Sequence, residues 1–242
     1  MKLNHLSNII VVVTFISTSI IAQPENASTE KLIKLADSLT AIQDYKAAKK
    51  LYKKALKTDK TSRRLLSALG LIAFEEEDWG KVKEYFNKIL QTHPDDLEAH
   101  YYLGIAYRET GKFKAFLLRK LDWNKSKKHF QQIISQDSLY RDVLYQFARL
   151  KRYRGKYEEA VQLGHAEVRL RPDLVEPQVK LFRLYRYLIT HRSEDKALKW
   201  LYTQPRDYAV YFAGEKLRRE GETEKADSIF QSLLNKPLKM PP

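Results

Sequence analysis

Residues 63–96 read RRLLSALGLIAFEEEDWGKVKEYFNKILQTHPDD, and this stretch decides the fold. Its apolar residues recur three, four and seven positions apart, first from Leu66 to Ala73 and again from Trp79 to Ile89, which is the period of an amphipathic helix. Glu77-Asp78 interrupts the first run, and Pro94 follows the second. The stretch therefore predicts two helices joined by a short turn.

The same pattern returns along the chain with a period of 34 residues. Leu66, Leu69 and Gly70 match Leu32, Leu35 and Ala36, and the tryptophan that opens the second helix matches Tyr45. Further copies contain, in order, His100, Leu103 and Gly104, then Leu144, Phe147 and Ala148, then Val210, Ala213 and Gly214. Self-similarity at such a fixed period is typical of a solenoid built from stacked repeats.

This pattern resembles the tetratricopeptide repeat, whose signature is W-x2-L-G-x2-Y followed by A-x3-F and a proline. The resemblance covers essentially all of residues 29–240. It implies an all-α fold, a right-handed superhelical solenoid of about six antiparallel helix hairpins. The expected repeats are about 29–62, 63–96, 97–140, 141–174, 175–206 and 207–240, after a linker at 23–28.

Small residues and helix stops agree with this arrangement. Gly104 and Gly214 stand where we expect the two helices of a hairpin to come closest, since helix axes pack about 8–10 Å apart. Between repeats, Pro94 and Pro172 each end a helix, and the aspartates that follow can cap the next helix.

Two copies depart from the pattern. The third contains ten extra residues, which include the basic and apolar segment 114–121. If the insertion is helical, it lengthens the helix by roughly 15 Å. We therefore expect this hairpin to protrude or fold back. The fifth copy has Phe182 in place of the small residue, and the expected loop at 190–193 shifts Ala197 out of phase. We expect the curvature to change there.

Composition and motifs favour a protein without catalytic machinery. The chain has no cysteine, which excludes disulfides, a cysteine nucleophile and thiolate metal sites. The six histidines show no metal-binding spacing, and no phosphate-binding loop or nucleophile elbow occurs. We therefore predict no enzyme activity, no cofactor and no bound metal.

The N-terminus has the layout of a secretory signal peptide. An apolar run from Ile9 to Ile21 follows Lys2 and ends at the small Ala22. The predicted signal peptide is 1–22, so the protein is expected in the periplasm or outside the cell. An uncleaved membrane anchor and a buried first helix are the alternatives.

The tetratricopeptide resemblance implies that certain positions of each first helix line a concave groove. In repeats three to six these positions carry mainly arginine and tyrosine, whereas in repeats one and two they do not. The predicted groove residues are Tyr101, Arg108, Tyr145, Arg149, Arg152, Tyr153, Arg183, Arg186, Tyr187, Tyr211 and Arg218. Arg219 occupies a further inward position of the last repeat. Guanidinium groups bind carboxylates in a bidentate manner and tyrosines add rigid contact area, so a protein or acidic peptide is the expected ligand. Alternatively, these are ordinary amphipathic side chains, some of them paired with Glu109 or Glu215.

Net charge and the chain ends leave other functions open. The first hypothesis is a non-catalytic exported scaffold for protein–protein contacts. A formal charge of +14 and the insertion around Phe116–Leu118 also suit an anionic envelope polymer or lipid headgroups. Nucleic-acid binding through charge alone conflicts with the predicted export. The last hairpin is expected to lack a covering helix beyond Phe230, which suggests a bound partner, self-association or the repeat half of a larger protein.

Overall fold

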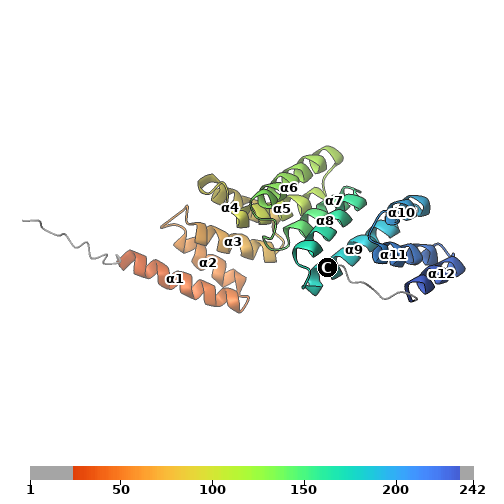
Figure 1. The fold of residues 1–242 in the computed structure, drawn as a ribbon. Helices are drawn as coiled ribbons and strands as arrows, with labels where there is room; N and C mark the ends of the chain where they lie inside the picture. The colour runs from red at the N-terminus through yellow and green to blue at the C-terminus, as the bar shows by residue number, and fades with distance from the viewer. Residues whose placement is uncertain (1–23, 235–242) are drawn as a thin grey trace, which may run out of the picture. The chain divides into compact units, whose positions relative to one another are not determined.

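The computed structural model describes residues 24–234, so the predicted signal peptide and the last eight residues lie outside it. Within this range the chain forms twelve α-helices and no β-strand (Figure 1). The prediction of an all-α fold made of antiparallel helix hairpins is confirmed. Two compact units, Met1–Lys60 and Thr61–Pro242, make up the chain. Among the described helices, none combines the length and apolar character required to cross a bilayer.

The first unit contains one hairpin, α1 (Pro24–Ala41) and α2 (Tyr45–Ala55). Ala36 and Ala48 are both completely buried, as expected for the small residues at the contact between its helices. The carboxylate of Asp44 caps α2 by accepting a hydrogen bond from the backbone N–H of Ala47 at 3.1 Å.

The second unit contains five hairpins. Their helices are α3 (Arg63–Glu75) and α4 (Trp79–Thr92), α5 (Leu97–Gly111) and α6 (Phe116–Gln136), α7 (Val143–Tyr153) and α8 (Tyr157–Leu170), α9 (Val175–His191) and α10 (Glu194–Leu201), and α11 (Arg206–Arg219) and α12 (Thr223–Leu234). The first helices of neighbouring hairpins also contact one another, α5 with α7, α7 with α9, and α9 with α11. Their side chains therefore form a continuous layer within this unit.

The glycines of the repeat lie against aromatic rings of the second helix. A Cβ atom added to Gly104 would lie 2.6 Å from a ring carbon of Phe130, and one added to Gly214 would lie 2.6 Å from a ring carbon of Phe230. Real Cβ atoms do not approach a carbon so closely, so any side chain at these positions would push the helices apart. The predicted role of the small residues is confirmed.

The turns inside four hairpins use a left-handed residue at the same place in the repeat. This residue has a φ of 62° at Gln43, 54° at Glu77, 71° at Gly155 and 87° at Gly221. A left-handed residue directly after a helix ends it, which explains why two of these four positions carry glycine.

The insertion in the third hairpin is helical. α6 begins at Phe116, so the inserted residues form its first turns, and the helix reaches 21 residues. Trp123 and Phe130, which follow the insertion, lie on the face that packs against α5: the indole Nε1 of Trp123 donates to the carbonyl of Arg108 at 3.2 Å. The residues before Trp123 thus extend the helix beyond its packed part.

The fifth hairpin departs from two expectations. The loop predicted at 190–193 was wrong, because α9 continues to His191 and the turn is correspondingly shorter. Asp173 does not cap α9, since the helix begins later and its N-cap is Leu174, which makes no side-chain hydrogen bond. Asp96, by contrast, caps α5 through the N–H of Ala99 at 2.8 Å. α10 has only eight residues, and its contacts with α11 are more extensive than its contacts with α9.

Candidate ligand-binding surface

A basic depression lies where the C-terminal ends of α9 and α11 meet in the second unit. It has a volume of about 320 Å3 and is open to solvent. The residues that line it are Arg183, Arg186, Tyr187, Thr190, His191 and Arg219. We call these residues, together with Arg152, which stacks on Tyr187, the arginine surface. Those on α9 are spaced three, four and seven positions apart, which puts them on one face of the helix.

Stacked rings and cations join α7 to this depression. The guanidinium of Arg152 lies 3.9 Å from the ring centre of Tyr187 and 4.6 Å from that of Tyr153, within the range of a cation–π contact. The ring of His191 stacks on Tyr157 at 5.3 Å. These contacts hold the lining residues Tyr187 and His191 in place, so a ligand would meet a largely preformed surface.

The arginines of this surface lack carboxylate partners. Across residues 24–234, no ion pair is made by Arg152, Arg183, Arg186 or Arg219, although Arg219 donates a hydrogen bond to Thr190 Oγ1 at 3.2 Å. Several arginines elsewhere in the second unit are neutralised, for example Arg192 by Glu158 at 2.8 Å. The surface therefore concentrates positive charge that no acidic side chain compensates.

Two of the predicted groove residues are buried instead of exposed. Arg108 has no exposed area, and its guanidinium donates to Glu109 at 2.9 Å and to the side chain of Gln146 at 2.7 Å. Burial, followed by repulsion from Arg149, lowers the pKa of Arg108 to about 10. Tyr101 is 8% exposed and donates to Asp142 at 2.6 Å. Both side chains tie α5 to α7.

Arg149 and Tyr153 lie beside this buried group. A guanidinium nitrogen of Arg149 lies 3.6 Å from a carboxylate oxygen of Glu109, and the ammonium of Lys112 lies 4.5 Å from the ring centre of Tyr153. Burial raises the pKa of the Tyr153 hydroxyl, but hydrogen bonds with Lys112 and Arg149 outweigh it and leave the pKa below its ordinary value. Tyr153 thus links the buried group to Arg152 of the arginine surface.

The remaining predicted residues flank the depression. Tyr145 is half-buried beneath Lys180, whose ammonium lies 5.0 Å from the ring centre. Tyr211 is 38% exposed and lies 5.7 Å from the ring of Phe182. Arg218 points elsewhere: its side chain is 61% exposed and pairs with Glu215 at 3.1 Å. The next residue, Arg219, lines the depression in its place.

Sequence reasoning missed Thr190 and His191 as lining residues, whereas it expected both Arg218 and Arg219 on the inner wall. Thr190 and His191 were assigned to a loop, yet they continue the spacing set by Arg183 and Arg186 and could have been read as one more helical turn. Arg219 differs from Arg218 by one residue, which rotates a side chain by about 100° on a helix. The choice between neighbours depends on how α11 is turned about its axis.

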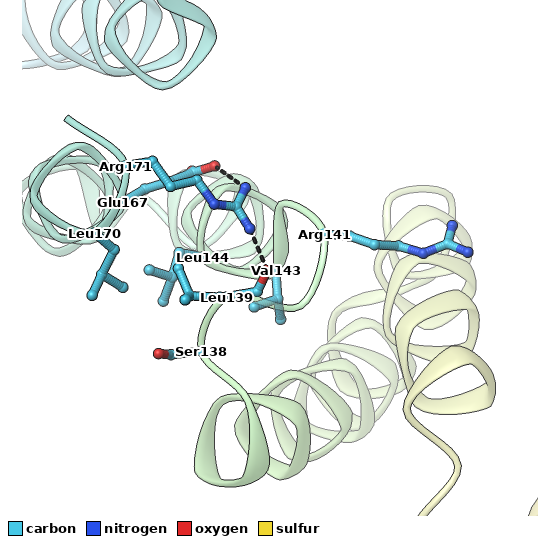
Figure 2. A pocket seen from close by; sticks show the side chains of 8 residues that line it. All are labelled: Ser138, Leu139, Arg141, Val143, Leu144, Glu167, Leu170 and Arg171. Atoms are coloured by element: carbon cyan, nitrogen blue, oxygen red, sulfur yellow. Dashed lines mark hydrogen bonds and ion pairs between the residues drawn. The ribbon is translucent and has the colours of Figure 1, made fainter. Parts of the chain in front are cut away.

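A second, smaller pocket lies between the start of α7 and the end of α8 (Figure 2). Its wall holds Glu167, which is 3% exposed and has no hydrogen-bond partner for either carboxylate oxygen. Arg171 closes one side, with its guanidinium 3.8 Å from Glu167 and donating to the carbonyl of Leu139. Burial raises the pKa of Glu167. Among the described residues, no group of three histidine or acidic side chains is placed to hold a metal ion.

The second unit is thus a helical repeat array in which α7, α9 and α11 share a cationic surface that includes Tyr187. Residues 32–96 match the family model described as YpiA-like, C-terminal tetratricopeptide repeats. A solved tetratricopeptide repeat protein from Parabacteroides merdae is similar, with a TM-score of 0.60 and 18% identity over 87% of this chain and 78% of that chain.

Two structures of MamA are also similar. One has a TM-score of 0.56 and 19% identity over 78% of this chain and 96% of that chain. The other, a double mutant of MamA RS-1, has a TM-score of 0.53 and 11% identity over 85% and 92%. No curated protein matches the sequence. Residues 32–96 thus match tetratricopeptide repeats, and the chain shares its helical repeat fold with these structures.

Proposed function

We infer that the chain is a non-catalytic scaffold that holds an acidic segment of a partner protein on the arginine surface. The observation that carries this inference is the group of four arginines without carboxylate partners around one open depression. Folding alone gains nothing from placing like charges together, whereas a ligand with several carboxylates would neutralise them through bidentate hydrogen bonds.

An exposed apolar patch beside the arginine surface indicates more about the partner segment. Val179 is 44% exposed, Phe182 41% and Tyr211 38%, and the two rings lie 5.7 Å apart. Phe182 precedes Arg186 by four residues, about 6 Å along α9. A fitting segment therefore combines acidic residues with an apolar side chain about one helical turn away.

The test is a selection of peptides from a random dodecapeptide library displayed on phage, with the full chain immobilised. We expect the recovered peptides to be rich in aspartate and glutamate and to contain an apolar residue. Binding of these peptides to Arg183→Glu/Arg186→Glu should be about 30-fold weaker or more, since two exposed charge pairs contribute about 1 kcal/mol each.

The matched control is Arg169→Glu/Arg218→Glu, which makes the same change in net charge at exposed arginines outside the depression. Unchanged binding by the first variant would refute the proposal. Equal loss in both variants, together with tight binding of polyphosphate, would favour the alternative that the protein binds an anionic envelope polymer through net charge alone.

We propose that the protein is exported, because residues 1–22 have the pattern of a secretory signal peptide. Fusion of the first 30 residues to alkaline phosphatase, which is active only after export, tests this. An inactive fusion in intact cells would contradict it.

A further inference from the structure

The first turns of α6 and the turn that precedes them expose an unusual group of large apolar side chains. Five such residues occur within nine positions, and each is more than half exposed. They are Phe113 (86%), Phe116 (73%), Leu117 (76%), Leu118 (55%) and Leu121 (52%). Single exposed apolar residues are ordinary, but a contiguous group of this kind marks an interaction site. We call these five residues the apolar tip.

The apolar tip is exposed because α6 is longer than the helix on which it packs. The buried face of α6 begins at Asp122 and continues through Ser126 and Phe130. Ser126 Oγ donates to the carbonyl of Gly104 at 2.7 Å, which marks where α6 meets α5. α5 ends at Gly111, and the turns of α6 before Asp122 have no α5 residue to cover them.

Positive charge surrounds the apolar tip. Residues 112–128 contain seven lysines and arginines and one aspartate, so the segment carries 7 − 1 = +6. The single carboxylate, Asp122, is neutralised by Lys114 at 2.7 Å. Within the described part of the chain, Lys120, Lys125 and Lys128 form no ion pair and are exposed. Lys125 and Lys128 follow Leu121 at four and seven positions, and thus on the same face of α6.

Apolar side chains at a helix end with cations along the same face fit the interface of an anionic membrane. Leucine and phenylalanine can enter the boundary between headgroups and acyl chains, while lysines remain at the level of the phosphates. A second copy of this chain would bring two segments of +6 together, and repulsion opposes that contact.

We propose that the apolar tip and the neighbouring lysines of α6 bind the surface of an anionic lipid bilayer. This contact is separate from the arginine surface, which lies on α7, α9 and α11. The protein would then hold a partner on one surface while the α6 end attaches to a membrane.

The experiment is co-sedimentation of the full chain with vesicles of phosphatidylcholine containing 30% phosphatidylserine, and with vesicles of phosphatidylcholine alone, in 150 mM salt. We expect binding to the anionic vesicles at least tenfold stronger than to the neutral ones. Leu117→Ser/Leu121→Ser should weaken it at least tenfold. The control Ile42→Ser/Leu139→Ser removes two exposed apolar side chains elsewhere (73% and 49% exposed) and should leave it unchanged.

Three further variants test the role of charge and the entry of the apolar tip into the bilayer. Lys120→Glu/Lys128→Glu should abolish binding, whereas Lys46→Glu/Lys50→Glu on the exposed side of α2 should reduce it far less. Fluorescence of Leu117→Trp should shift to shorter wavelength with anionic vesicles only, because the indole enters an apolar medium.

Three results would overturn the proposal. The first is no binding to anionic vesicles, the second is full binding by Leu117→Ser/Leu121→Ser, and the third is loss only in the lysine variant, which would indicate adsorption by charge alone. A parent chain that is dimeric and ignores vesicles, with a monomeric Leu117→Ser/Leu121→Ser variant, would instead assign the tip to a second copy.

Discussion

Arg108 and Arg186 occupy equivalent places in the repeat, yet we predict that methionine substitutions at the two positions affect different properties of the protein. Arg108→Met removes a buried guanidinium that donates to Glu109 at 2.9 Å and to the side chain and carbonyl of Gln146 at 2.7 and 3.1 Å. Arg186→Met changes an exposed side chain that makes no ion pair in the described part of the chain. Stability should therefore respond to the first substitution and ligand binding to the second.

The magnitude for Arg108 follows from its contacts. Breaking a buried ion pair costs about 3–5 kcal/mol when the partner is left uncompensated. Glu109, however, keeps Lys112 and lies 3.6 Å from Arg149, and methionine avoids burying a charge whose pKa burial has already lowered to about 10. We expect a net loss of about 2–3 kcal/mol. For Arg186→Met the expected change lies within about 0.5 kcal/mol.

Urea unfolding followed by far-ultraviolet circular dichroism measures both effects. With a slope of about 2–3 kcal/mol per molar, the Arg108→Met midpoint should fall by about 1 M, and the Arg186→Met midpoint should stay with the parent. Peptides selected on the parent should bind Arg186→Met more weakly. An Arg108→Met chain as stable as the parent would refute the structural role, and an equal loss in Arg186→Met would refute the distinction between the two positions.

Two further predictions concern packing and pH. Gly104→Ala should lower the free energy of unfolding by about 1–2 kcal/mol, because its Cβ would lie 2.6 Å from the buried ring of Phe130. In urea unfolding, Phe130→Leu should cost less stability in the Gly104→Ala background than in the parent. Additive losses from the two substitutions would contradict the clash. Glu167→Gln should stabilise the protein by about 1 kcal/mol at pH 7, because burial raises the pKa of this carboxyl and its charged form lacks hydrogen bonds. The native state binds the Glu167 proton more tightly than the unfolded state, so the parent loses stability as pH rises through the native pKa. The advantage of glutamine should thus disappear near pH 4, and an advantage that persists there would contradict the assignment.

Much of the fold followed from local patterns. The apolar period of 3.6 residues, the 34-residue repeat and the small residues at Gly104 and Gly214 predicted the hairpins and their closest contacts, because each of these signals acts between residues near in sequence. The limits of α9 were missed because the expected loop at 190–193 was placed by phase with the other repeats. Helix ends depend on local capping and packing, which vary from one repeat to the next.

The candidate site was predicted in residue type more accurately than in position. The sequence indicated that arginine and tyrosine gather on the first helices of repeats three to six. It could not separate Arg108 from Arg186, since the repeat phase assigns both to the same side of their helices. Burial of the first comes from α7, which supplies Gln146 to cover it, and this contact spans 38 residues of sequence.

By itself, therefore, the sequence of this protein determined the helical repeats, their number and the cationic character of their first helices, because spacing on a helix converts directly into a shared face. Tertiary structure alone decided which arginines reach solvent, that Arg219 and not Arg218 lines the depression, and that the inserted apolar residues of α6 stay uncovered. Those outcomes depend on how far each helix extends past its neighbour and how it is rotated about its axis, and both are set by packing between helices distant in the chain.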